Sequence, residues 1–191
     1  GVEVNNIASG NDAIQIITNR KFRDVSSWYH IVVAFDSTQS TDTDRMKIYI
    51  NGVQQDSTGT RVNPSLNYDS MFNLQNGHSI GRNHAYNNFF FSGYITDVHF
   101  IDGSQLAPTS FGAADSNGVW QRSTYSGSYG TNGYHVLDFA NDGTIGNDTS
   151  GQGNNYTANN FSETAGSGND VLFDFPTNDT VNTDSGAGGE V

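Results

Sequence analysis

The chain has 191 residues and a formal net charge of −12, and only 34% of its residues are hydrophobic. With only 8 Lys and Arg, it lacks the clustered cations that neutralise phosphates, which argues against binding to nucleic acid or to anionic membranes. It has no Cys and no apolar run of the length that a bilayer requires, so disulfides, thiolate metal sites and membrane insertion are not expected.

The N-terminal half predicts short strands joined by polar turns. Residues 1–12 are polar and are expected to lead in from a longer polypeptide, and the first strand is predicted over residues 13–18. Residues 28–35 are aromatic and β-branched and end at a polar cluster, which predicts a strand entering a loop.

A hairpin is predicted at residues 46–55. Met46, Ile48 and Ile50 alternate with Lys47 and Tyr49, so the three apolar side chains share one face of a strand. The dipeptide that follows, Asn-Gly, supplies the two positive φ angles of a type I′ turn.

Two more strands are predicted further along the chain. They cover residues 78–82 and 94–101, and the second is closed by an Asp-Gly turn. Together with the hairpin, these strands indicate an antiparallel β domain.

Four segments in this order resemble a known family: SWYHIVVAFD, RMKIYINGVQ, HSIGRN and FFFSGYITDVHFIDG. They are similar to the laminin G-like and pentraxin-like jelly rolls of the concanavalin A-like superfamily. The nearest resemblance is to versions in large virion proteins of marine bacteriophages, and it covers residues 17–160. No single motif is diagnostic, but the ordered set is. The resemblance implies an all-β fold, an antiparallel β-sandwich jelly roll with a loop-rich C-terminal extension.

The expected domain organisation places the jelly roll over residues 13–118, an extension over residues 119–161 and an extended tail over residues 162–191. In the family, several strands precede the equivalent of the first strand here. The later segment YHVLDFANDG resembles the opening strand and first loop of such a domain. Either it begins a second, truncated domain, or it closes the same sandwich. We favour closure, because a lone strand pair is only marginally stable, and closure predicts contact between residues 134–139 and 94–101.

Calcium is the cofactor that we expect, because hard cations take oxygen ligands from Asp, Asn and carbonyl groups in loops. The resemblance implies a site at the pattern D-x-S-G-x-G-N over residues 148–154. The candidate ligands are Asp142, Asn147, Asp148 and Asn154. The alternative is that the loop glycines form turns in which Asp and Asn side chains bond the backbone.

Glycan binding requires aromatic faces beside polar side chains on exposed loops. The candidates are Tyr86, Asn87, Asn88, Trp120, Tyr125 and Tyr129. The alternatives are that residues 89–91 form a hydrophobic strand start and that the Tyr, Ser and Gly-rich residues 124–133 form an interface with a neighbouring subunit.

No catalytic site is predicted. The only glutamates are Glu3, Glu163 and Glu190, so the paired glutamates of a glucanase strand are absent, and no Ser lies in a G-x-S-x-G turn. The histidines within predicted strands are expected to be packed or to lie on a sheet face, and the loop residue His84 is the one that could touch a ligand.

The predicted function is that of a phage virion structural protein, a tail fibre, tailspike or capsid decoration, whose lectin-like domain binds a glycan on the host surface. The alternative is an assembly-only element of the capsid or tail that recognises no glycan. The expected partners are other virion subunits and a host-surface glycan, and a homo-oligomer is expected. The protein would fold in the bacterial cytoplasm and reside in the virion.

Overall fold

The computed structural model describes residues 2–7, 13–24, 26–56, 58–73, 77–84, 90–136 and 145–159. It divides into two compact units, the first formed by residues 1–74 and 104–127 and the second by residues 75–103 and 128–191. The strands are β1 (Glu3–Ile7), β2 (Ala13–Thr18), β3 (Ile31–Phe35), β4 (Met46–Ile50), β5 (Val53–Gln54), β6 (Thr58–Val62), β7 (Val98–Phe100), β8 (Gly112–Ala114), β9 (Trp120–Arg122) and β10 (Tyr134–Val136).

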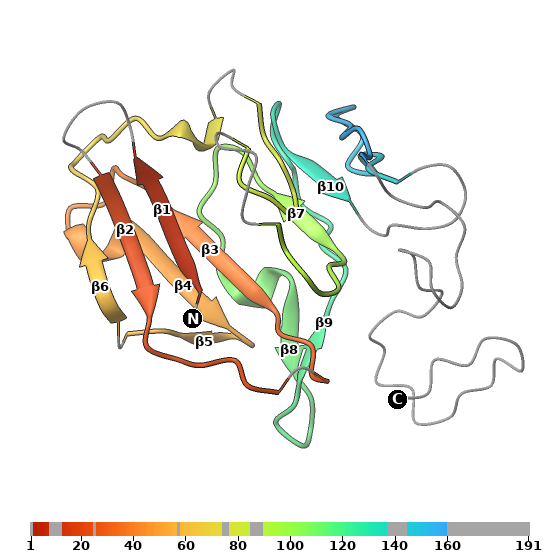
Figure 1. Ribbon diagram of the computed structural model, residues 1–191, viewed down its shortest axis with the longest axis horizontal. Helices are drawn as coiled ribbons and strands as arrows, with labels where there is room; N and C mark the ends of the chain where they lie inside the picture. The colour runs from red at the N-terminus through yellow and green to blue at the C-terminus, as the bar shows by residue number, and fades with distance from the viewer. Residues whose placement is uncertain are drawn as a thin grey trace, which may run out of the picture. The chain divides into compact units, whose positions relative to one another are not determined.

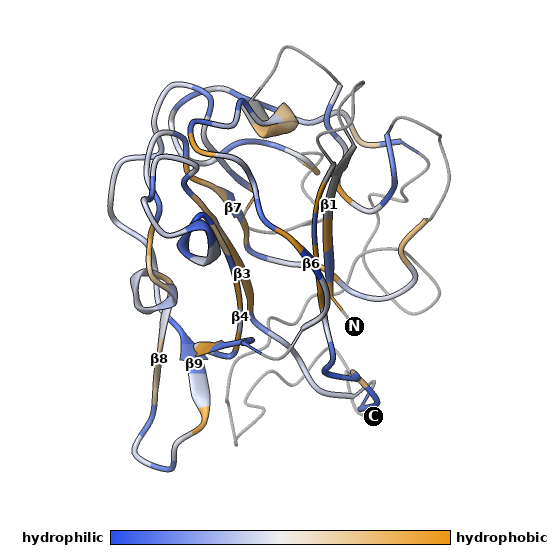
Figure 2. Cartoon of the chain, turned by 90° about the vertical axis from the view of Figure 1, so that its left-hand side faces the viewer, coloured by the Kyte–Doolittle hydropathy of each residue, from blue (hydrophilic) through white to orange (hydrophobic). Residues whose placement is uncertain are grey.

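The first unit contains an antiparallel β-sandwich. One sheet has the strand order β1-β2-β6 and the other has the order β3-β4-β5, and every neighbouring pair is antiparallel. Figure 1 shows the strands of both sheets, and Figure 2 shows them as two layers, with β1 and β6 in one and β3 and β4 in the other. The all-β fold class predicted from the sequence is confirmed. In the part of the chain that is described, the only helices are three short 3₁₀ turns, and none could cross a membrane.

The core of the sandwich lies between its two sheets. The predicted alternation of β4 is confirmed, because Met46, Ile48 and Ile50 are fully buried while the two residues between them are half-buried. The facing layer contributes Ile14 and Ile16 from β2, which are 1% and 0% exposed. Each such side chain contributes roughly 2 kcal/mol of burial free energy, so these five residues account for much of the stability of the unit.

The polar N-terminal segment forms a strand that the sequence did not predict. β1 pairs with β2 in continuous register from Glu3 opposite Ile17 to Ile7 opposite Ala13, and Val4 is 7% exposed against the core. The expectation that residues 1–12 form only a polar lead-in is therefore wrong for this stretch. Pairing satisfies the backbone of an edge strand even where its side chains are polar, so composition alone misses it.

The type I′ hairpin turn between β4 and β5 is confirmed. Asn51 and Gly52 have φ angles of 48° and 76°. The ring of Trp120 covers the turn, and a Cβ atom added at Gly52 would collide with it. The turn is therefore restricted by both its backbone conformation and this contact.

Replacing Gly52 by alanine is expected to destabilise the first unit by about 3 kcal/mol, because alanine both resists a positive φ and collides with the indole. Gly118→Ala is the matched control, since Gly118 has a φ of 80° but an added Cβ meets no atom within 4 Å. Chemical denaturation of both variants measures the difference. Equal losses would show that the contact with Trp120 adds nothing to the backbone penalty.

Three predicted strands differ from the structure. Residues 28–30 are outside β3, the strand predicted over residues 94–101 is shortened to β7 at residues 98–100, and residues 78–82 are not a strand. Gly81 has a φ of 84°, which breaks the extended backbone, and its carbonyl accepts a hydrogen bond of 2.7 Å from the N–H of Phe91. This segment is therefore a turn held against the start of the next apolar run.

The second unit contains a strand pair that joins distant segments. β7 pairs with β10 in antiparallel register, with Phe100 opposite Tyr134, His99 opposite His135 and Val98 opposite Val136. This is the contact that the sequence predicted between residues 94–101 and 134–139, of which residues 137–139 lie outside the described range. The pairing places two histidines side by side.

The segment around the expected domain boundary at residues 108–118 is occupied by a second hairpin. β8 pairs with β9, and Asp115 closes the turn by accepting hydrogen bonds from the N–H groups of Asn117 and Val119. These bonds lower the pKa of Asp115. This hairpin belongs to the first unit, with the strands of the sandwich.

Candidate functional site

The loop after β10 is organised by Asp148. Its Oδ1 accepts hydrogen bonds of 2.8 Å from the N–H groups of His135 and Ser150, and its Oδ2 accepts one of 2.9 Å from the N–H of Asn154. The carboxylate therefore connects both ends of its own loop to β10.

The electrostatics of Asp148 follow from these contacts. Burial by itself would raise its pKa, but the hydrogen bonds from Ser150 and from the three backbone N–H groups outweigh burial and lower the pKa to about 2. The carboxylate is therefore ionised at every physiological pH.

The predicted calcium ligands are only partly brought together. Asp148 and Asn154 lie in one turn, Asn147 is exposed, and Asp142 lies outside the described residues. The Asn154 side chain is turned as a donor, with Nδ2 bonding the carbonyls of Thr131 and Gly133 at 3.0 and 2.8 Å. In the described part of the loop, the Asp148 carboxylate and the Asn154 amide bond the backbone, as in the alternative of turns closed by Asp and Asn side chains. The calcium site stays a prediction.

Trp120 is packed inside the first unit. Its Nε1 donates a hydrogen bond of 3.0 Å to Nδ1 of His30, and the two rings stack with centroids 5.6 Å apart. The indole also covers Gly52 and Gly112. This candidate for sugar stacking therefore links β9 to the hairpin turn.

The two candidate tyrosines lie in different units. Tyr125 packs on Phe111 at 5.1 Å between ring centroids. Tyr129 is only 7% exposed, and its hydroxyl lies 2.9 Å from Nδ1 of His99, contrary to the exposed position expected from the sequence. The remaining glycan candidates, Tyr86, Asn87 and Asn88, lie outside the described residues.

Among the described residues, the most exposed aromatic side chains begin two positions after Asn88. Phe90, Phe91 and Tyr94 are 68%, 56% and 65% exposed. None of them lies in a strand, so the alternative of a hydrophobic strand start is wrong for residues 90 and 91. Exposed aromatic rings in one short segment mark a binding surface.

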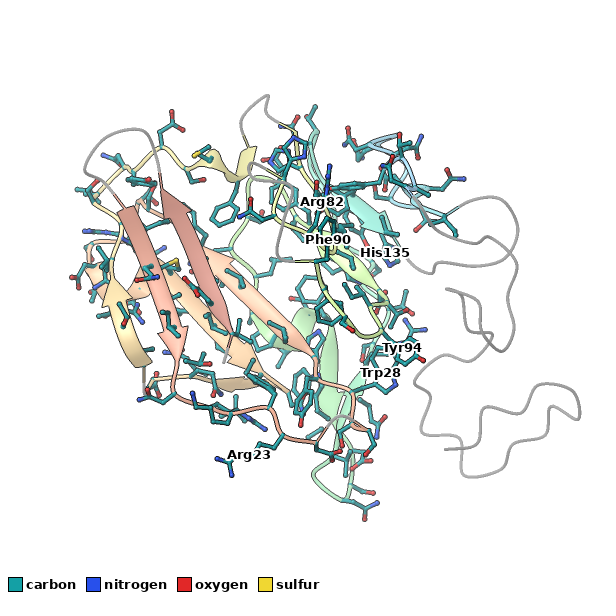
Figure 3. The ribbon with its side chains drawn as sticks, viewed as in Figure 1. Arg23, Trp28, Arg82, Phe90, Tyr94 and His135 are labelled. Atoms are coloured by element: carbon teal, nitrogen blue, oxygen red, sulfur yellow. The ribbon has the colours of Figure 1, made fainter. Side chains whose placement is uncertain are left out.

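Polar side chains border this aromatic segment. The hydrogen bond from the Phe91 N–H to the Gly81 carbonyl holds it against the turn at residues 79–84, where Ser79 Oγ lies 2.9 Å from His84 Nδ1 and 3.3 Å from Arg82 Nε. Figure 3 labels Arg82 in the turn and Phe90 and Tyr94 in the aromatic segment. We call residues 79–84 and 90–94 the aromatic segment surface.

A second cluster lies on the β7–β10 pair. Oδ1 of Asp97 is 3.1 Å from Nε2 of His99 and 2.8 Å from Nε2 of His135. The two imidazoles stack with centroids 4.0 Å apart and planes inclined by 12°. Among the described residues, this is the group of three His, Cys, Asp or Glu side chains whose ligand atoms converge, all within 4.8 Å.

The sequence did not predict this histidine cluster. It did predict that both histidines lie in strands and that the two strands come into contact. Only the register, which sets His99 opposite His135, makes them neighbours. The signal that could have found the cluster is an Asp just before one strand, with a His at the centre of that strand and another at the centre of its partner.

Comparison with known families and proteins gives one match. A family model described as the concanavalin A-like lectin/glucanases superfamily matches residues 3–109, more than half of the chain. The match runs from β1 to the 3₁₀ turn before β8 and covers both sheets of the sandwich. Neither the curated proteins nor the solved structures contain a significant match.

Proposed function

Because the chain belongs to the concanavalin A-like lectin/glucanase superfamily, we propose that it is a carbohydrate-binding module. The aromatic segment surface binds the sugar, and no bond is broken. The observation that carries the proposal is the exposure of Phe90, Phe91 and Tyr94 in a segment that the Phe91–Gly81 hydrogen bond joins to the turn containing Arg82 and His84. Aromatic faces exclude water from the apolar face of a sugar ring, while adjacent donors and acceptors bond its hydroxyls.

Binding is favoured over hydrolysis by the carboxylates available. A glycosidase of either stereochemical class uses two carboxyl groups at a set separation across the scissile bond. Of the three glutamates, Glu3 lies on β1, and Glu163 and Glu190 lie outside the described residues. No E-x-D-x-E pattern occurs in the sequence. A lectin-like role therefore agrees better with the chain than a glucanase role.

The biological setting that we propose is a bacteriophage virion. The support is the ordered set of four segments that resembles jelly rolls of marine phage virion proteins. In this setting the module is part of a tail fibre, tailspike or capsid decoration. Its ligand is a glycan on the host surface, and its neighbours are other virion subunits, including copies of itself.

The test is glycan binding by the full chain and by variants of the aromatic segment surface. Binding on a glycan array, followed by calorimetry with the best ligand, is expected for the wild type. Phe90→Ala and Tyr94→Ala are each expected to weaken binding about tenfold, the loss typical of one aromatic contact in a binding site. Leu66→Ala is the matched control, since Leu66 is 55% exposed in the other unit and is expected to change nothing.

A second candidate function, assembly without glycan recognition, is favoured by a different surface. Ile31 and Val33 on β3 are 46% and 42% exposed, and Val53 on β5 is 63% exposed. Three exposed aliphatic side chains on one sheet suit an apolar contact with another subunit. Absence of glycan binding, together with self-association that Val33→Ser abolishes, would replace the lectin proposal with this one.

A further inference from the structure

We propose that Asp97, His99 and His135 form a binding site for a divalent transition-metal ion, with Zn²⁺ as the representative ion. This inference goes beyond carbohydrate binding and does not depend on it. Two imidazole nitrogens and one carboxylate oxygen already converge in the second unit, with all three ligand atoms within 4.8 Å. Imidazole together with carboxylate is a ligand set that zinc and its neighbours prefer, whereas calcium and magnesium prefer oxygen alone.

The backbone fixes the position of all three side chains. His99 and His135 are directly opposed in the antiparallel β7–β10 pair, so their side chains leave the same face of the two strands. Asp97 lies two residues before His99 and has a φ of 55°, a conformation that non-glycine residues rarely adopt. The left-handed backbone conformation of Asp97 brings its carboxylate to the two Nε2 atoms. Backbone conformations of this rare kind are concentrated at functional sites.

The opposite ring nitrogens are also held. Nδ1 of His99 lies 2.9 Å from the hydroxyl of Tyr129, and Nδ1 of His135 lies 3.0 Å from Oγ1 of Thr149. Metal-binding histidines characteristically donate their other N–H to an oxygen, which fixes the tautomer and the ring orientation. Both histidines therefore have the outer partners that a metal site requires.

In the metal-bound form, each ring N–H group has a hydrogen-bond acceptor. With an ion, the Nε2 lone pairs bind the metal and each imidazole carries its proton on Nδ1. Thr149 then accepts from Nδ1 of His135 and donates to the His135 carbonyl, which lies 3.0 Å from its Oγ1. No buried donor is left without an acceptor at this position.

The charge and burial of the cluster also suit a cation. The side chains of Asp97, His99 and His135 are 15%, 11% and 13% exposed, so the carboxylate is screened little by water. Two neutral imidazoles and one carboxylate carry one negative charge together, so the bound site with a divalent ion carries one positive charge. Because the two rings are nearly parallel, binding requires them to turn apart about their Cβ–Cγ bonds until both Nε2 lone pairs meet the ion.

The test is zinc binding by the full chain without a histidine tag. Calorimetric titration with ZnCl₂ is expected to give a stoichiometry of one ion per chain. When Co²⁺ is added in place of Zn²⁺, the visible spectrum is expected to show the d–d absorption bands of an ion in a low-symmetry site. His99→Ala and His135→Ala are each expected to weaken Zn²⁺ binding at least about 100-fold, and Thr149→Val about tenfold. His78→Ala is the matched control, because His78 is an exposed histidine outside the cluster, and this variant is expected to bind Zn²⁺ as the wild type does.

The ring-nitrogen NMR spectrum of the wild-type chain provides a measurement that needs no variant. Zn²⁺ is expected to shift Nε2 of His99 and His135 and to leave His78 and His84 unchanged. The proposal is overturned if the wild type binds no Zn²⁺, if the shifted nitrogens belong to His78 or His84, or if His78→Ala loses as much affinity as the cluster variants. Ca²⁺ in place of Zn²⁺ is expected to shift neither histidine.

Discussion

Replacing Asp148 by alanine is expected to lower the stability of the second unit by about 3 to 4 kcal/mol. The change removes the acceptor of three backbone N–H groups, on His135, Ser150 and Asn154, at 2.8 to 2.9 Å. Leaving a partly buried donor unsatisfied costs about 1 to 3 kcal/mol, and bonds to a charged acceptor lie at the upper end of that range. Hydrogen exchange of these three amides measures the effect directly, because each is expected to lose protection.

Asn147→Ala is the matched control for this variant. Asn147 is the preceding residue in the same loop and is exposed, so its removal is expected to change stability by no more than about 0.5 kcal/mol. If Asn147→Ala and Asp148→Ala cost the same, or if the three amides keep their protection, then the carboxylate does not organise the loop.

The same carboxylate predicts how stability depends on pH. The pKa of Asp148 is about 2 in the folded chain and 3.8 ordinarily, a difference that corresponds to about 2 kcal/mol. Because folding lowers this pKa, the contribution is present in full above pH 4 and is lost as the pH falls from about 4 to about 2. Asp148→Asn is therefore expected to be less stable than the wild type at pH 7, and the two are expected to converge near pH 2.

The part of the fold that the sequence predicts is the part governed by local patterns. The alternation of β4 and the Asn51-Gly52 turn depend on neighbouring residues, so both could be assigned before any tertiary contact was known. β1 could not, because only Val4 among residues 3–6 is apolar and the strand exists through its pairing with β2. For residues 78–82 the sequence predicts a strand that does not form, since Gly81 at a positive φ breaks an otherwise strand-like run.

The candidate sites depend on contacts between distant segments and were predictable to a lesser degree. Residues 86–88 combine aromatic and amide side chains, and the exposed rings that the structure describes begin two positions later, at Phe90. The Asp148 turn was anticipated as the alternative to calcium, since D-x-S-G side chains commonly bond their own backbone. His99 and His135 are 36 positions apart, so their contact follows from strand register alone.

Replacing Arg45 by methionine is expected to destabilise the first unit by about 3 kcal/mol. The guanidinium donates to three backbone carbonyls, with Nε bonding Gln39 at 2.8 Å, Nη1 bonding Pro64 at 2.9 Å and Nη2 bonding Ser40 at 3.1 Å. These bonds tie the loop after β3 to the segment after β6, and hydrogen bonds with a charged donor are each stronger than neutral ones.

Two further variants separate the geometry of this arginine from its charge. Arg45→Lys keeps the charge but presents one ammonium in place of a planar fork, so it is expected to recover less than half of the loss. Lys47→Met removes a nearby cation whose ion pair with Asp44, at 3.0 Å, is partly exposed, and it is expected to cost less than about 1 kcal/mol. Urea denaturation measures all three variants. Full recovery of stability in Arg45→Lys would show that the positive charge, and not the three hydrogen bonds of the planar guanidinium, holds the loop on the edge of the sandwich.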